Sequence, residues 1–266
     1  MLIDLDFQGS LSSMLVSPGH MAPIAGRSKA AIVVDEPVNA ANFLNMLVPV
    51  NRIESARALP AYYDLAQAEN QIMVKWLLKE DKPDIRFKLS EILLHEQVQN
   101  AFDIIIIDAP PRMTTGAIQA FCASTHVLIP MILDGMSGNA AATFVDQIEG
   151  LKSAGVCPQI KVIGVVGSMT AQDVGAQVEG HPDAETNMFL TLAERQGVAA
   201  LKSALQRIQR DRRLPHPPAQ MLPETTFIQK LAIIANHAGE SVVYVTGSDA
   251  VRQMFERLGR EIQLRL

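Results

Sequence analysis

Short runs of apolar, β-branched residues recur along this chain and constrain its fold more than any other feature. Each run is too short for a buried helix and has the length and composition of a buried strand. Four runs precede residue 170 and a fifth comes late. The expected strands are Met1–Leu5, Asp103–Ile107, Val127–Met131, Lys161–Val166 and Ser241–Val245.

Segments with helical periodicity separate these runs. Strands that alternate with helices need crossover connections, which favour a mostly parallel sheet with helices on both faces. The sequence therefore predicts the α/β fold class. The expected helices are Tyr63–Leu78, Lys88–Gln99, Gly116–Ala123, Gly138–Ser153, Thr186–Gln209 and Ser248–Leu266, the last capped by Ser248.

Two irregular segments complete the organisation. Residues 214–223 contain four prolines, which exclude a helix and predict a linker. The polar segment Thr170–Asp183 is predicted to be a loop. Because no repeat or low-complexity tract is present, we expect a single domain over residues 1–266.

Composition narrows the possible functions. With 48% apolar and 19% charged residues, the chain resembles folded rather than disordered proteins. The net charge of −5 excludes a global basic field, so any DNA contact needs a local patch. Cys122 and Cys157 stand alone, which excludes a disulfide framework and a recognisable zinc site. No stretch predicts a membrane helix or a signal peptide, so we expect a cytoplasmic protein.

Two of the expected strands end in aspartate. Asp4 and Asp6 close the first run, and four isoleucines deliver Asp108 to the end of the second. Ligands of open parallel sheets bind at the carboxyl ends of the strands. A carboxylate there can hold Mg²⁺ as a Walker B residue, although it can equally cap the next helix.

The motifs around these aspartates resemble those of the ParA/MinD family of deviant P-loop ATPases. Asp4-Leu-Asp-Phe-Gln-Gly-Ser10 is similar to the family's Asp-x-Asp-Pro-Gln-Gly, with Phe7 where proline is usual, and Asp108-Ala-Pro-Pro111 matches Asp-x-Pro-Pro. Three further segments resemble the family in order. They are Ala58-Leu-Pro-Ala-Tyr-Tyr-Asp-Leu-Ala-Gln-Ala-Glu69, Ala123-Ser-Thr-His-Val-Leu-Ile-Pro130 and Leu222-Pro-Glu-Thr225.

This resemblance implies a P-loop NTPase fold that uses ATP and Mg²⁺. Asp6 would orient the water that attacks the γ-phosphate, and Asp108 would hold Mg²⁺ through water with support from Asp4. Alternatively, Asp4 is a strand residue satisfied by backbone donors. The residues that would line the nucleotide are Gly9, Ser10, Pro110, Pro111 and Pro223.

The family's phosphate-binding loop has no counterpart in the printed sequence. No Gly-x4-Gly-Lys-[Ser/Thr] occurs, and Gly26-Arg-Ser-Lys29 is better explained as a solvated loop. A start assigned at an internal methionine and a degenerate chain both explain this. We expect the fold to lack its first strand and helix, which leaves a sheet edge open. We also expect negligible ATP binding and doubtful ATPase activity, because loop amides provide most phosphate contacts.

Two basic groups are candidates for DNA binding. One group precedes the linker and the other lies on the last helix, and for each a solvated helix face is the favoured alternative. The residues are Arg207, Arg210, Arg212 and Arg213, with Arg252, Arg257 and Arg260.

Three functions follow from the resemblance. The first is a partition-type ATPase that forms an ATP-dependent homodimer and binds DNA and a ParB-like activator, without a membrane. The second is a non-catalytic module that keeps the fold and a partner surface. The third is a metabolic or iron–sulfur relative.

Overall fold

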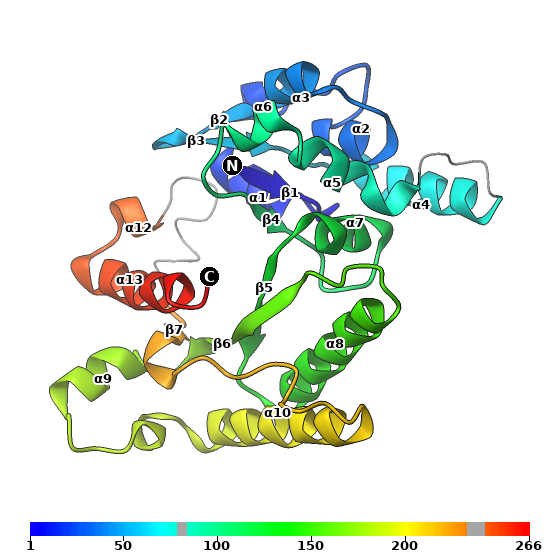
Figure 1. Cartoon of the computed structure of the whole chain (residues 1–266). Helices are drawn as coiled ribbons and strands as arrows, with labels where there is room; N and C mark the ends of the chain where they lie inside the picture. Colours follow the sequence, from blue (N-terminus) through cyan, green and yellow to red (C-terminus); the bar gives the residue numbers. More distant parts are fainter. Residues whose placement is uncertain (79–83, 233–242) are drawn as a thin grey trace. The chain divides into compact units, whose positions relative to one another are not determined.

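In the computed structural model of the chain, the first apolar run forms an inner strand of a four-stranded sheet (Figure 1). β1 (Leu2–Asp4) pairs in parallel with β3 (Ile53–Leu59) and with β4 (Ile106–Asp108). β2 (Val48–Val50) pairs with β3 in the antiparallel direction, so the strand order is β2-β3-β1-β4. The mostly parallel α/β class is therefore confirmed for this sheet.

The structure describes residues 1–78, 84–232 and 243–266, which divide into two compact units. The first unit is built on Met1–Ser124, and the second on the described residues from Thr125 onward. The expectation of a single domain stays a prediction.

Helices of the first unit bury an apolar core against its sheet. Ile3, Leu5, Phe43, Leu65 and Leu89 are fully buried there. The helices are α1 (Ser10–Leu15), α2 (Lys29–Asp35), α3 (Ala40–Met46), α4 (Asp64–Leu77), α5 (Lys88–Leu93), α6 (Glu96–Gln99) and α7 (Thr115–Ala123), with 3₁₀ turns η1 (Pro18–His20) and η2 (Ile85–Phe87).

The second unit has a parallel three-stranded sheet. β5 (His126–Ile132), β6 (Lys161–Thr170) and β7 (Ile228–Gln229) pair in that order. Its helices are α8 (Gly135–Ser153), α9 (Val174–Gly180), α10 (Leu192–Asp211), α12 (Val243–Thr246) and α13 (Asp249–Gln263), with 3₁₀ turns η3 (Thr186–Phe189) and η4 (Glu224–Thr226).

One side of β4 pairs with no strand among the described residues. The Met1 amino group donates to the Ile104 carbonyl at 2.6 Å, and the Ile106 N–H donates to the Met1 carbonyl at 2.9 Å. Because backbone groups alternate along a strand, those of Ile105 and Ile107 point away from β1. The side chains of Ile104 and Ile106 are 61% and 57% exposed. The first sheet thus ends in an open, apolar edge.

Several expected boundaries were wrong because short polar side chains start new helices. The predicted helix Lys88–Gln99 is divided at His95, whose Nδ1 accepts from the Gln97 N–H at 3.3 Å. The predicted helix Thr186–Gln209 is divided by a capping box of Thr191 and Glu194.

Two further predictions fail. The expected loop Thr170–Asp183 contains α9, because the Asp173 carboxylate accepts from the Ala176 N–H and caps a helix. In the expected strand Ser241–Val245, residues 241–242 lie outside the described residues, and Val243–Thr246 is helical. Apolar length alone does not separate a short strand from a helical turn.

The proline-rich segment 214–223 is irregular, as predicted, but it packs along β6. The Leu222 N–H donates to Val165 O and the Val165 N–H donates to Gln220 O, each at 2.8 Å. Leu222 and Ala219 are buried. The segment is therefore held to its unit by backbone pairing and by side-chain burial.

Arg257 on α13 fastens three parts of the second unit. Its side chain is 13% exposed and forms an ion pair with Asp173, the residue that caps α9. Its Nε donates to the Thr225 carbonyl at 3.1 Å. A Cβ at Gly175 would lie 2.2 Å from that Nε, so a glycine is required where the arginine passes α9.

We predict that Arg257→Ala lowers the free energy of unfolding by about 2–4 kcal/mol, because it leaves the largely buried Asp173 unpaired. Arg260→Ala is the control, since that side chain is 73% exposed and its pair with Glu256 should contribute below about 0.5 kcal/mol. Urea unfolding followed by circular dichroism measures both. Equal, small effects would contradict a structural role for Arg257.

Candidate functional site

Asp4 and Asp108 end adjacent parallel strands and lie side by side. They are direct partners in the register of β1 and β4, and the Leu5 N–H donates to the Asp108 carbonyl at 2.8 Å. Each strand follows from its apolar run, and each stops where the run gives way to a polar turn. The structure therefore brings the predicted acidic strand ends together at one edge.

The Asp4 carboxylate is fully buried and holds three segments in place. Oδ2 accepts from the Ser12 N–H at 2.9 Å and from the Ser12 hydroxyl at 2.6 Å, and Oδ1 accepts from the Asp6 N–H at 3.1 Å. The Ser12 hydroxyl in turn accepts from the Ala61 N–H at 2.9 Å. Burial is the largest influence on this carboxyl and raises its pKa. Sequence reasoning missed Ser12, which had no motif to mark it.

A tight turn follows Asp4 and positions Asp6. The Gly9 N–H donates to the Asp6 carbonyl at 2.9 Å, and the Gln8 N–H donates to the Asp6 carboxylate at 3.0 Å. Gly9 has φ +61°, and a Cβ there would lie 2.9 Å from the Ala61 carbonyl oxygen, so only glycine fits. Ser10 then opens α1 with its side chain exposed.

The surroundings of Asp108 disfavour the ionised form of its carboxylate. Partial burial, together with the negative charges of Asp4 and Asp6, raises its pKa to about 6. Its side chain is nevertheless open to solvent on one side. Because a cation would relieve this repulsion and carboxylate oxygens are the ligands that Mg²⁺ prefers, the edge fits a magnesium ion.

The edge does not form a complete metal cage from protein side chains. Within the described ranges, no group of three or more His, Cys, Asp or Glu side chains could hold a metal ion. A fit to Mg²⁺ therefore requires water or ligand oxygens in addition to the carboxylates, as is usual for this ion.

The Pro110-Pro111 segment leads from Asp108 into α7. Pro110 is buried and Pro111 is exposed. Thr114 caps α7 by accepting from the Ala117 N–H at 3.2 Å, and the buried Glu69 on α4 accepts from the Gly116 N–H at 2.8 Å. Glu69 ends a segment that resembles the family, and its side chain also holds the start of the helix that follows the prolines.

Pro223 lies in the second unit, where it precedes η4 beside the buried Leu222. Its position is thus known within that unit only. The predicted nucleotide-lining residues Gly9, Ser10, Pro110 and Pro111 belong to the first unit.

The candidate DNA-binding arginines differ in their partners. Arg212 pairs with Asp146 on α8, and Arg257 is committed to Asp173. Arg252 and Arg260 form pairs within α13, with Asp249 and Glu256. Among the described residues, no acidic side chain pairs with the exposed residues Arg207, Arg210 and Arg213.

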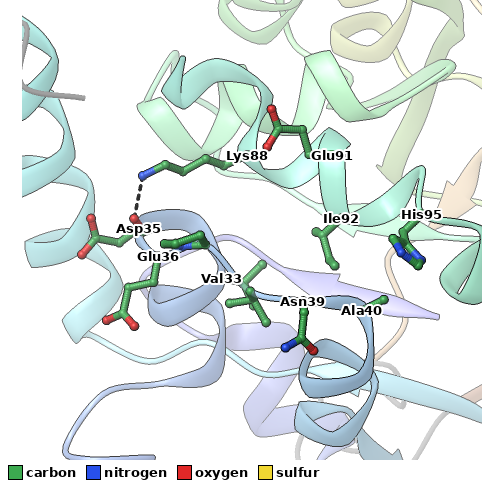
Figure 2. Close-up of a pocket in the computed structure, with 11 residues that line it drawn as sticks. Val33, Asp35, Glu36, Asn39, Ala40, Lys88, Glu91, Ile92 and His95 are labelled. Carbon is green, nitrogen blue, oxygen red and sulfur yellow. Dashed lines mark hydrogen bonds between the residues drawn. The ribbon is translucent and has the colours of Figure 1, made fainter. Parts of the chain in front are cut away.

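A separate cavity of about 650 Å³ lies at the end of α2 (Figure 2). Figure 2 shows Asp35, Glu36 and Glu91 around it, with the Lys88 ammonium donating to the Asp35 carbonyl at 2.6 Å. None of the predicted site residues lines this cavity.

In the part of the chain that the structure describes, no helix combines the length and apolar character needed to cross a bilayer.

A mostly parallel sheet covered by helices, with carboxylates at the ends of adjacent strands, is the arrangement of the P-loop NTPase fold. The chain belongs to the AAA_31 family, whose model, described as an AAA domain, matches residues 1–162. The ParA/MinD-like character that the motifs implied is thereby confirmed.

Two curated relatives illustrate the similarity. An uncharacterized protein of Pseudomonas putida is 30% identical over 129 residues, which is 46% of this chain and 45% of that protein. The chromosome-partitioning ATPase Soj of Treponema pallidum is 27% identical over 131 residues, 49% of this chain and 44% of Soj. The chain thus spans about half the length of the curated relatives it matches.

Solved structures show the same fold. Apo McdA of Cyanothece superposes with a TM-score of 0.70 at 15% identity, covering 98% of this chain and 86% of McdA. A variant of that McdA, in complex with ATP, gives a TM-score of 0.68 at 14% identity and covers 98% and 84%. The agreement extends over nearly the whole chain.

We predict that Asp108→Asn raises the melting temperature at pH 7.5, and that the gain vanishes toward pH 4. The folded-state pKa of about 6 lies above the ordinary value, so ionisation of Asp108 opposes folding as pH rises through this range. The gain should be about 1–2 °C, because solvent screens this partly exposed group.

Differential scanning fluorimetry across pH 4–8 measures this effect. Asp183→Asn is the control, since that carboxylate is exposed in the second unit. A gain that is constant with pH would contradict the electrostatic explanation.

Proposed function

We propose that this chain is a ParA-like ATPase of the partition type, which works as an ATP-dependent dimer switch. The observation that carries the proposal is the meeting of Asp4, Asp6 and Asp108 at the carboxyl edge of neighbouring parallel strands, where such folds bind ligands. The names of the relatives support it, since Soj is a chromosome-partitioning ATPase and McdA has been solved with ATP.

In this proposal the three carboxylates have separate roles. Asp108, which lies near the negative charges of Asp4 and Asp6, holds Mg²⁺ through water. Asp6 orients the water that attacks the γ-phosphate. Asp4 supports the Mg²⁺ shell and fixes the Asp6 turn through the Asp6 N–H. Bound Mg²⁺ neutralises phosphate charge during transfer. Gly9, Ser10, Pro110, Pro111 and Pro223 are the proposed nucleotide-lining residues.

We predict that Asp6→Ala leaves nucleotide binding intact and abolishes slow hydrolysis, in a form of the protein that carries the family's phosphate-binding loop. A water-orienting carboxylate acts in the transition state, whereas binding depends on the phosphate cradle. Steady-state phosphate release and equilibrium nucleotide titration measure the two effects.

Asp6→Asn separates catalysis from folding of the turn. Its amide oxygen can still accept from the Gln8 N–H, so the turn survives without the negative charge. Loss of hydrolysis in both variants supports the catalytic role. Normal hydrolysis by Asp6→Asn would reduce Asp6 to a turn residue.

The proposal includes DNA binding by a homodimer, release through a ParB-like activator, and a cytoplasmic location. With a net charge of −5, a DNA surface must be local. The best supported group is Arg207, Arg210 and Arg213 at the end of α10, which we call the α10 basic group. These side chains are exposed and have no acidic partner in the described ranges, whereas Arg212 is occupied by Asp146.

We predict that alanine at all three positions of the α10 basic group flattens the salt dependence of DNA binding by roughly one logarithmic unit per lost phosphate contact. Filter binding over a salt series, with and without ATP, measures the slope. Arg195→Ala is the control, because it removes an exposed arginine from the other end of the same helix.

The outcomes separate the two main hypotheses. An unchanged slope in the triple variant would clear the α10 basic group and direct attention to Arg252 and Arg260. Complete absence of ATP-dependent DNA binding would favour the alternative, a non-catalytic module that keeps the fold and a partner surface.

A further inference from the structure

Arg112 is stacked on an aromatic ring next to the acidic edge. Its guanidinium carbon lies 5.8 Å from the centroid of the Phe7 ring. The side chain is exposed, and no described residue forms a hydrogen bond or an ion pair with the guanidinium. Stacking on a ring face leaves the N–H groups along the rim of the guanidinium free to donate.

The Phe7–Arg112 pair joins the segments that follow two paired strands. Phe7 follows β1 and Arg112 follows β4, and these strands end side by side at Asp4 and Asp108. Among the described residues, no ion pair joins the Arg112 guanidinium to Asp4, Asp6 or Asp108. The positive charge of Arg112 therefore stays unpaired in the segment that follows Asp108.

A second arginine in the same unit shows what an occupied stack looks like. Arg86 lies 5.4 Å from the centroid of the Phe87 ring, but its Nε donates to both oxygens of Asp84 at 3.0 Å. That charge is consumed within the protein. Arg112 has the same stacking without a carboxylate partner, so its guanidinium can bind an external anion.

We propose that Arg112, oriented by the Phe7 ring, contacts phosphate oxygens of a polyphosphate ligand whose Mg²⁺ lies at Asp108. This inference rests on the proposed function and adds a phosphate-contacting residue to it. A planar guanidinium matches two phosphate oxygens at once, and charge-assisted hydrogen bonds of this kind are the strong ones. The aromatic ring at position 7, where related sequences have proline, would then serve to aim the arginine.

The test measures weak binding of inorganic tripolyphosphate and Mg²⁺ to the full chain, by the broadening of phosphorus NMR signals at millimolar ligand. The chain with alanine at the α10 basic group is the background, because it removes the three exposed arginines proposed to bind the phosphates of DNA. Arg112→Ala should weaken binding about tenfold, and Arg112→Lys should retain part of it. Phe7→Leu should weaken binding about threefold, since the arginine is present but no longer stacked.

Arg86→Ala is the matched control and should leave tripolyphosphate binding unchanged. Melting temperatures of all variants show whether each has folded, and Arg112→Lys stands in if Arg112→Ala has not. Unchanged binding in both Arg112 variants would overturn the inference and leave the proposed ATPase intact. Absence of tripolyphosphate binding by the parent chain would overturn it as well.

Duplex DNA serves as a second probe, because its backbone offers the same phosphate chemistry. If Arg112→Ala weakens binding of a short duplex but not of tripolyphosphate, Arg112 belongs to a DNA surface and the inference is wrong. Failure of the proposed function has a different signature, namely no hydrolysis and no ATP-dependent DNA binding whatever residue stands at 112.

Discussion

The buried carboxylate of Asp4 is the interaction on which the candidate site depends. A charge with no solvent contact is tolerated only when donors surround it, and here the donors come from the Asp6 turn and from Ser12. Through the Ser12 hydroxyl the same network reaches Ala61, ahead of α4. One side chain therefore fixes the ends of β1 and α1 and the segment that follows β3. Asp4 provides the buried contacts of this edge, whereas Asp6 is partly exposed and Asp108 is exposed.

This arrangement separates support from chemistry along a motif of seven residues. The Asp4 carboxylate accepts hydrogen bonds from Ser12 and from the Asp6 N–H. The Asp6 carboxylate accepts one from the Gln8 N–H and is partly exposed. The third carboxylate, on the neighbouring strand, receives the unfavourable charge of both. In the proposed function, a divalent cation at this edge would take its remaining ligands from water or from the nucleotide, because the side chains do not complete a cage.

The sequence predicted what depends on local pattern and missed what depends on distant contacts. Four isoleucines before Asp108 were enough to place its strand within a few residues and to place its carboxylate at the sheet edge. Strand β3 was missed as an apolar run because polar residues, Glu54, Ser55 and Arg57, interrupt Ile53–Leu59. The partners Ser12, Glu69 and Arg112 could not be predicted, because each acts on a residue that is remote in the sequence. Both cap residues were visible in the sequence, but His95 lay within a helical periodicity and Asp173 lay in a polar segment predicted to be a loop.

The two prolines after β4 also limit how far its open edge can extend. Ile105 and Ile107 present outward backbone groups, so a further strand could continue the ladder there. Pro110 and Pro111 have no N–H to donate, and the ladder must stop before them. The pairing of any strand with this edge, whatever chain the strand comes from, therefore ends at the two prolines. A strand that joins in the direction parallel to β4 would bring its own carboxyl end to the same place.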